Sequence, residues 1–360
     1  MNTTRKLASV KPITYIKPIE GADAIECAIV DGGWPVVVKK GEFQVGDTAI
    51  YFEIDSWVPY SIAPFLSKGK EPREYNGVKG EKLRTVRLRG QISQGLLLPL
   101  NTPINGGPFN GGYGLCVLGL ECGTDLTDVL GVQKWEAPVS AQLAGNARGN
   151  FPSFIPKTDQ ERCQNLRKNI FETHKDEVYE VTVKLDGSST TAYIRDGEVG
   201  VCSRNIDLKE DDNNTFWKVV KAQHIDQALT TFHAATGRSV AIQGELIGES
   251  IQKNHEKIQG QQLHVFDVYD IDEQEYLSPH ARDTVLRALE GFGATIYHVP
   301  VLEQYCVVSN VFSSIDGILE FAEGESITPG VKREGVVFKS LQSSFSFKAI
   351  SNSYLLKKKE

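Results

Sequence analysis

The residues best placed to do chemistry are Lys184, Asp186 and Gly187, which follow directly on the strand-like segment 177–183. A lysine removed from water can be neutral near pH 7, and a neutral amine can attack phosphorus. The aspartate would orient the amine or hold metal-bound water, and the glycine lets the backbone approach a ligand closely. Taken alone, Lys-x-Asp-Gly is more often a surface hairpin, so the order of the later motifs decides between the two interpretations.

Five later segments place charged or aromatic residues on short β-type sequences. They are 201–205, 242–248, 264–269, 333–339 and 346–351. Together they supply an arginine, two glutamates, an aromatic platform and two further lysines. This set suits attack on the α-phosphate of a nucleoside triphosphate, with pyrophosphate as the leaving group.

The order of these motifs resembles the covalent nucleotidyltransferase superfamily of polynucleotide ligases and mRNA capping enzymes. Within it, the chain resembles the RNA ligase family with an N-terminal OB domain, typified by the Deinococcus and Naegleria ligases. The resemblance covers nearly all 360 residues. It implies an ATP-dependent ligase of RNA repair that joins a 3′-hydroxyl RNA end to a 5′-phosphate end. The reaction would pass through a lysyl-AMP intermediate and an adenylylated 5′ end.

The resemblance also implies roles for individual residues, with Lys184 as the nucleophile that carries AMP. The residues expected to contact the nucleotide or the RNA end are Asp186, Gly187, Arg204, Glu245, Phe266, Lys339, Lys348, Arg162 and Gln164. The carboxylates expected to hold the water shell of Mg²⁺ or Mn²⁺ are Glu334, Glu245 and Asp186.

Several of these residues have an ordinary structural alternative. Arg204 could be a strand-edge arginine, Phe266 a core aromatic and Glu334 one half of a structural ion pair. The segment with Arg162 and Gln164 could instead be a helix-capping element that docks two domains. The final motif departs from the Lys-x-Lys of many RNA ligases, since it begins with Ser346. The role of the first lysine then falls to Lys339 or is absent.

Bulk properties narrow the class of protein. The net charge of −7 argues mildly against a nucleic-acid partner, unless the basic residues gather on one face. The six cysteines form no metal-ligand spacing, so we expect reduced thiols in a cytoplasmic protein, or a nuclear or organellar one in a eukaryote. No stretch reaches membrane-spanning length, and no Walker loop is present. We expect a monomer that binds a nicked duplex with an RNA 3′-hydroxyl end.

Strand and helix patterns predict an α+β protein in which an OB-like β-barrel precedes an antiparallel-sheet nucleotidyltransferase domain of the ATP-grasp-like ligase type. The boundaries are 1–105 for the barrel, 106–150 for a connector and 151–360 for the transferase domain. The predicted barrel strands contain residues 36–38, 49–54, 83–88 and 95–99. The predicted helices contain residues 126–130, 215–229 and 279–292, with a further helix capped by Thr158 or Asp159.

The predicted barrel also carries a ladder of basic residues, formed by Lys82, Arg84, Arg87 and Arg89. Arg87 and Arg89 would share one face of a strand by the two-residue period, which suits contact with a phosphate backbone. An ordinary solvated strand is the alternative.

Two other functions compete with RNA ligation. A capping guanylyltransferase or a DNA ligase would place its OB domain after the last lysine motif, whereas the candidate barrel here precedes Lys184. A non-catalytic OB-type nucleic-acid binder with a degenerate transferase domain would be expected to have lost some of the motif residues. Covalent labelling of the protein by GTP but not by ATP would favour the guanylyltransferase. The absence of labelling by any nucleotide would favour the non-catalytic binder.

Overall fold

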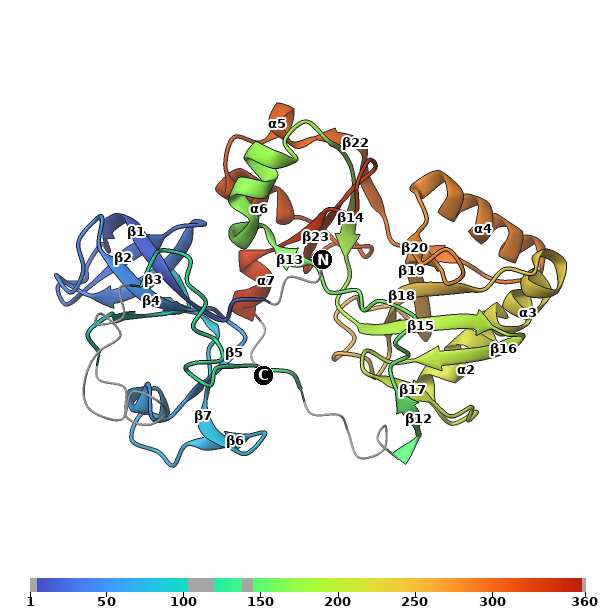
Figure 1. Cartoon of the computed structure of the whole chain (residues 1–360), viewed down its shortest axis with the longest axis horizontal. Coiled ribbons are helices and arrows are strands. Elements are labelled where there is room, and N and C mark those ends of the chain that lie inside the picture. The colour runs from blue at the N-terminus through green and yellow to red at the C-terminus, as the bar shows by residue number, and fades with distance from the viewer. Residues whose placement is uncertain (1–4, 103–119, 138–144, 358–360) are drawn as a thin grey trace. The chain divides into compact units, whose positions relative to one another are not determined.

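The computed structural model describes residues 5–102, 120–137 and 145–357. The chain divides into two compact units, one that extends to Pro138 and one from Val139 to Lys358 (Figure 1). The boundaries at 105 and 150 stay a prediction, but the described segment 120–137 packs within the first unit. Parts of the predicted connector, 106–119 and 138–144, lie outside the described residues.

The first unit is built on a curled antiparallel sheet. Its strand order is β10 (Leu96–Pro99), β4 (Thr48–Phe52), β1 (Ala8–Pro18), β2 (Ile25–Val30) and β3 (Trp34–Lys39). Strand β1 pairs with β4 through its first half and with β2 through its second, and a register shift lies between Ile13 and Tyr15. Such an irregularity bends a strand, which lets one sheet curl round a small core.

A second sheet and a ribbon complete this unit. The sheet has the order β11 (Gln133–Lys134), β5 (Ser56–Pro59), β7 (Val78–Lys82) and β6 (Arg73–Tyr75), and the 3-10 helix η1 (Pro64–Ser67) packs on β7. The ribbon pairs β8 (Thr85–Leu88) with β9 (Gln91–Gln94). The segment predicted as a helix at 126–130 is a turn instead, and it places Leu126, Leu130 and Val132 in the core.

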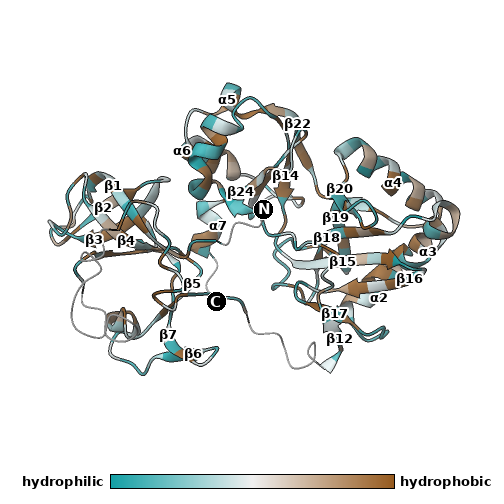
Figure 2. Ribbon diagram, viewed as in Figure 1, coloured by the Kyte–Doolittle hydropathy of each residue, from teal (hydrophilic) through white to brown (hydrophobic). Residues whose placement is uncertain are grey.

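The second unit contains two sheets. The larger has the order β12 (Ala147–Asn150), β17 (Ile206–Leu208), β16 (Glu198–Cys202), β15 (Ser188–Arg195), β18 (Val240–Gly248), β19 (Gln261–Asp270) and β20 (Glu275–Tyr276), with β21 (Tyr297–His298) beside β19. Helices α2 (Thr215–Ala222), α3 (Ile225–Thr236) and α4 (Pro279–Gly291) pack against its apolar residues. Figure 2 shows the hydrophobic colouring of β16 and α2 where they meet.

The smaller sheet carries the lysine motifs. Its order is β13 (Glu161–Arg162), β24 (Ser346–Ile350), β23 (Gly335–Ser340), β14 (Val178–Lys184) and β22 (Val301–Val307). Around it lie η4 (Cys163–Leu166), η5 (Asn169–Thr173), α5 (Val308–Val311), α6 (Ile315–Ala322) and α7 (Asn352–Lys357). All its pairings are antiparallel except that of β13 with β24.

The two-residue period of a strand separates the two faces of this smaller sheet. One face is apolar and includes Tyr179, Val181, Phe338 and Phe347 in a single cluster. The alternate positions carry Glu180, Lys184, Lys339, Ser346 and Lys348. The β-pattern of the sequence therefore gathers the charged residues of several motifs on one face.

Two helix predictions need correction. The segment 215–229 forms two helices, because His224 adopts a left-handed φ of 55° between α2 and α3. The preceding Gln223 hydrogen-bonds the backbone of Leu263 and Thr295, so tertiary contacts fix this break. The helix with a cap at Thr158 or Asp159 is also wrong, since the chain first pairs as β13 with β24 and η4 begins only at Cys163.

The predicted helix at 279–292 is confirmed as α4, which a buried ion pair joins to β14. Arg282 donates to both carboxylate oxygens of Glu180, at 3.0 and 2.8 Å, and to the carbonyl oxygen of Phe266 at 3.3 Å. Both charged side chains are almost wholly buried. Each charge therefore depends on the other for its solvation.

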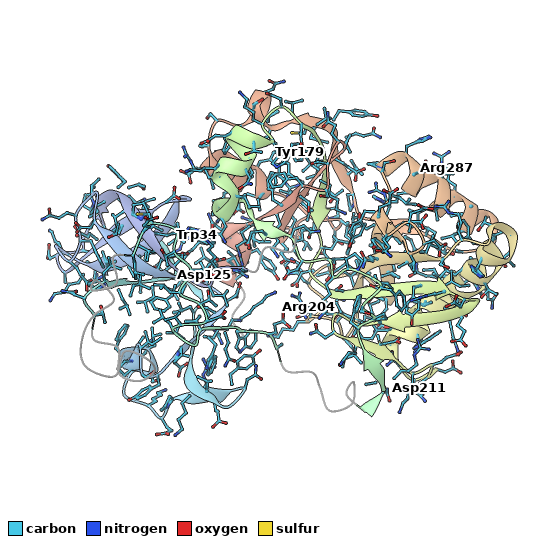
Figure 3. All side chains as sticks on the ribbon, viewed as in Figure 1. Trp34, Asp125, Tyr179, Arg204, Asp211 and Arg287 are labelled. Carbon is cyan, nitrogen blue, oxygen red and sulfur yellow. The ribbon has the colours of Figure 1, made fainter. Side chains whose placement is uncertain are left out.

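We predict that Arg282→Ala lowers the free energy of unfolding by about 3–5 kcal/mol, because it leaves the Glu180 carboxylate buried without a cation. Urea denaturation of the second unit measures this loss. Arg287→Ala is the matched control on the same helix, since Arg287 is largely exposed and pairs with Asp283 at 2.9 Å (Figure 3). The control should cost about 1 kcal/mol or less. Equal losses for both substitutions would contradict the prediction.

Candidate active site

The site is centred on the amine of Lys184, the last residue of β14. In the sheet, Lys184 lies opposite Gly335 at the start of β23. This register brings the preceding residue, Glu334, beside the amine, and Lys184 Nζ lies 2.8 Å from Glu334 Oε2. Both side chains are mostly buried. The ion pair proposed as the alternative role of Glu334 is therefore present, and its partner is the candidate nucleophile.

The protonation state of Lys184 differs from the sequence-based expectation of a neutral amine. Burial favours loss of the proton, but the negative charges of Glu334, Glu245 and Asp186 outweigh it. The pKa of Lys184 therefore lies above its ordinary value. With only the charges that the protein provides, Lys184 is an ammonium ion and a poor nucleophile. Its activation requires a change in the charge around it.

Asp186 is fixed by groups from distant parts of the chain. Its backbone N–H donates to Glu256 Oε1 at 3.3 Å, and its carboxylate hydrogen-bonds the side chain of Tyr354 on α7. Glu256 and Tyr354 are both buried. Burial first, and then the negative charges of Glu334 and Asp186, raise the pKa of Tyr354, so its hydroxyl remains a donor. These contacts orient the Asp186 carboxylate.

Gly187 is required for a different reason than expected from the sequence. A Cβ atom at this position would lie 2.3 Å from the carbonyl oxygen of Leu246 and 2.9 Å from Cγ of Glu245. The group that approaches Gly187 is therefore strand β18. This close approach brings Glu245 next to the Lys184 motif, and its role toward a nucleotide stays a prediction.

Glu245 lies in β18 opposite Ser189 of β15. The pKa of its carboxyl is raised to about 7, chiefly by burial and also by the charges of Glu334 and Asp186, against the lowering effect of Lys184. The protein thus places three acidic side chains close enough to interact around one lysine. A divalent cation would relieve this repulsion.

The chemistry of these donors fits the predicted metal. Glu334, Glu245 and Asp186 offer only oxygen atoms, which suit Mg²⁺ or Mn²⁺. Among the described residues, no three His, Cys, Asp or Glu side chains are grouped as direct ligands of one ion.

Lys348 on β24 faces the same site. Its Nζ lies 2.9 Å from Oδ1 of Asp159, and Oδ2 of Asp159 lies 3.3 Å from a terminal nitrogen of Arg204. The pKa of Lys348 is lowered to about 8, chiefly by burial; Asp159 opposes this shift, and the charges of Lys184 and Arg162 add to it. Several cations therefore lie close enough to repel one another, as in a phosphate-binding site.

Arg162 reaches this group through the short parallel pairing of β13 with β24, where it lies opposite Lys348. It is buried, as is Gln164, whose side-chain oxygen lies 3.4 Å from Cys163 Sγ. The structure thus brings Arg162 to the lysines, whereas the contact of Gln164 is with a core cysteine. The roles of both toward a nucleotide stay predictions.

Phe266 is the extra residue of a β-bulge. Gln243 pairs with Asp267 and Gly244 with Val265, so β19 advances by two residues where β18 advances by one. Bulges re-aim side chains, and they recur beside active sites. Gly244 makes room for this bulge, because a Cβ atom at residue 244 would lie 2.6 Å from the carbonyl oxygen of His264.

Lys339 is held beside this aromatic ring. Its Nζ lies 5.2 Å from the centre of the Phe266 ring, 3.1 Å from the Phe266 carbonyl oxygen and 2.6 Å from Asp267 Oδ1. In the sheet, Lys339 lies directly opposite Ser346. Paired residues share a face, so Lys339 projects beside the position where the Lys-x-Lys motif would begin. This placement supports Lys339 as the substitute.

Sequence reasoning missed four residues of the site: Asp159, Glu256, Asp267 and Tyr354. Asp159 was considered only as a helix cap. Asp267 directly follows Phe266 in its motif and could have been found there. Glu256 and Tyr354 lie in segments without a recognisable pattern.

None of the described helices is long and apolar enough to cross a membrane.

Comparisons with known proteins agree with this geometry. A model of the RNA ligase family matches residues 177–352, and a model of an OB-fold domain matches residues 7–100. No curated protein matches.

Solved structures extend the similarity to almost the whole chain. An apo mutant of Naegleria gruberi RNA ligase is 45% identical with a TM-score of 0.85, over 98% of each chain. Another mutant of that ligase, with ATP and Mn, is 45% identical with a TM-score of 0.84, over 97% of this chain and 98% of that one. The ligase with PPi is also 45% identical with a TM-score of 0.84, over 98% of each chain. The predicted fold class is thereby confirmed.

We predict that Gly187→Ala destabilises the second unit by about 1–3 kcal/mol, because its methyl group must displace the backbone of β18. Gly149→Ala in β12 is the control, since nothing lies within 4 Å of the added Cβ atom. The control should change stability by less than about 0.5 kcal/mol. Thermal unfolding of both variants makes the comparison. A Gly187→Ala variant as stable as the unchanged protein would show that β18 can move aside at little cost.

Proposed function

The chain belongs to the RNA ligase family, and from this premise we propose that it is an ATP-dependent ligase that joins RNA ends through a lysyl-AMP intermediate on Lys184. The observation that carries the proposal is the position of the Lys184 amine. It lies at the end of a buried strand, 2.8 Å from Glu334, on the sheet face that also presents Lys339 and Lys348. An amine, carboxylates and phosphate-binding cations thus meet in one place.

In the first step, Lys184 Nζ loses its proton to water and forms a bond to the α-phosphorus of ATP. The bond between that phosphorus and the bridging oxygen breaks, and pyrophosphate leaves. In the second step, an oxygen of a 5′-phosphate end forms a bond to the phosphorus of AMP, the bond between that phosphorus and Lys184 Nζ breaks, and the amine takes up a proton. In the third, a 3′-hydroxyl attacks that end, a phosphodiester forms and AMP leaves.

The carboxylates that would hold Mg²⁺ or Mn²⁺ are Glu334, Glu245 and Asp186. When bound, the ion supplies positive charge that favours the neutral form of the amine and stabilises the developing phosphate charge. Glu334 also positions the amine by the hydrogen bond already described. A cation would favour the ionised form of Glu245, which burial otherwise disfavours by raising its pKa to about 7.

The cations would bind the phosphates. Lys348 is the group closest in the sheet to Arg162 and would neutralise the α-phosphoryl, with Lys339 as the second lysine. Phe266 would stack on adenine, an arrangement supported by the bulge that re-aims it. Arg204 and Gln164 would contact the ribose or the RNA end.

The first unit would bind the nucleic acid. The basic residues predicted as a ladder, however, do not form one face of a strand. Lys82 is buried on β7, where its Nζ lies 3.5 Å from the centre of the Trp135 ring. Arg89 lies in the turn after β8 with a left-handed φ of 48°, whereas Arg87 lies within β8. Both arginines are exposed, and the ribbon 85–94 contains no acidic residue. This ribbon suits phosphate contact.

The finer features of the substrate and setting are part of the proposal. The substrate is a nicked duplex with an RNA 3′-hydroxyl end, and the active form is a monomer. The protein would act in the cytoplasm, or in the nucleus or an organelle of a eukaryote. The free thiols of the described cysteines support a reducing compartment.

Lys184→Ala should abolish covalent labelling by ATP while the protein stays folded. Lys184→Arg should also fail, because a guanidinium does not deprotonate near neutral pH. The measurement is incubation with labelled ATP and magnesium, followed by a denaturing gel. Label that persists on folded Lys184→Ala would exclude Lys184, and label from GTP but not ATP would indicate a guanylyltransferase.

Glu334→Ala should suppress lysine adenylylation about a hundredfold, far more than its loss of stability explains, because it removes both a metal-site carboxylate and the partner of the amine. EDTA should have the same effect on the unchanged protein. The rate of adduct formation and the melting temperature are measured together. Adenylylation at full rate without a divalent ion would remove the metal role.

A chain that lacks residues 1–138 should still form the AMP adduct but seal nicked duplexes poorly, because every residue assigned to adenylylation lies in the second unit. Both reactions are followed side by side. Within the full chain, the pair Arg87→Ala and Arg89→Ala should weaken sealing alone, whereas Lys68→Ala with Lys70→Ala serves as a charge-matched control. Loss of adduct formation in a folded truncated chain would refute this division of labour.

A further inference from the structure

We propose that Asp159 acts as an internal substitute for a phosphate group, in that its carboxylate competes with bound phosphate for Lys348 and Arg204. The inference rests on the proposed function, since it concerns how the same site receives the phosphates of its substrates. It adds a residue to which the family motifs assign no role.

The geometry is that of a bridging anion. One carboxylate oxygen of Asp159 lies 2.9 Å from Lys348 Nζ and the other 3.3 Å from a terminal nitrogen of Arg204. Lys348 comes from β24 of the smaller sheet, and Arg204 follows β16 of the larger one (Figure 3 labels Arg204). A phosphate presents oxygens in several directions and can bridge two such cations in the same way.

The charges favour exchange of one anion for the other. Burial and the charges of Lys184 and Arg162 act against the protonated form of Lys348, and Asp159 is the acid that compensates. A phosphate carries more negative charge and more acceptor oxygens than a carboxylate, so it compensates these cations better. The stretch 156–160 precedes β13 without regular structure, and Asp159 is 39% exposed. The carboxylate can therefore turn toward water when a phosphate takes its place.

A purely structural role predicts the opposite result. If Asp159 only positioned Lys348, its removal would leave the lysine misplaced and weaken the binding of any anion. If Asp159 competes, its removal takes a competing carboxylate away from both cations and strengthens binding. The sign of the change therefore separates the two roles.

The test is isothermal titration calorimetry of the full chain with inorganic pyrophosphate, at pH 6.5, which is below the pKa of about 8 that Lys348 has beside Asp159. Asp159→Asn should bind pyrophosphate about fivefold more tightly than the unchanged protein. The gain should vanish when Lys348→Ala is added. Asp159→Glu should bind no more tightly than the unchanged protein, because it keeps the competing charge. Asp212→Asn is the matched control, since Asp212 also pairs with a lysine, Lys221, at 2.7 Å.

Unchanged or weaker binding by Asp159→Asn would overturn the proposal, as would a gain that survives Lys348→Ala. If Asp159→Asn does not fold, Asp159→Ser supplies the neutral variant and is held to the same outcomes. The readout does not depend on catalysis. A gain in pyrophosphate affinity in a protein that takes no label from ATP would refute the ligase function and leave the competition standing.

Discussion

A buried cation needs an anion beside it, and this requirement organises the second unit. Lys184 pairs with Glu334, Lys348 with Asp159, Lys339 with Asp267 and Arg282 with Glu180. Each pair joins side chains from different elements, so the charges also hold those elements together. Because a pair in a low-dielectric setting depends on both partners, each lysine is held in position by an acid from another segment of the chain.

The same pairing explains how a cationic site can exist in an acidic protein. The net charge of −7 is spread over the whole chain, whereas the polar face of the smaller sheet gathers its cations by the two-residue period of β14, β23 and β24. A phosphate bound at this face would take the place of acids that neutralise the cations. A metal ion would instead bind to such acids. Two backbone features complete the arrangement: Gly187 brings β18 against the lysine turn, and Gly244 accommodates the bulge at Phe266.

The sequence was sufficient to predict the motif-bearing strands and the order of the two folded parts, because β-periodicity is local, and it named most of the residues that the structure brings together around Lys184. It was insufficient where a partner comes from far along the chain. Glu334 is 150 residues from Lys184 and Asp159 is 189 residues from Lys348, and no local pattern relates them. For the same reason the pKa of Lys184 could not be inferred from its strand alone. Lys82 was misjudged because its aromatic partner, Trp135, lies in a segment taken for a connector.

The position of β24 has a consequence for the newly made chain. This strand lies between β13 and β23 and supplies Lys348, yet it is synthesised more than 150 residues after the first strand it must pair with. Chains emerge from the ribosome N-terminus first, so β13 waits with an exposed edge until β24 appears, and β14 waits for β22 and β23. The first unit can complete its sheets much earlier. A ribosome-bound chain would therefore carry a folded first unit while Lys184 still lacks the strand that presents Lys348, and the smaller sheet would be complete only once β24 is made.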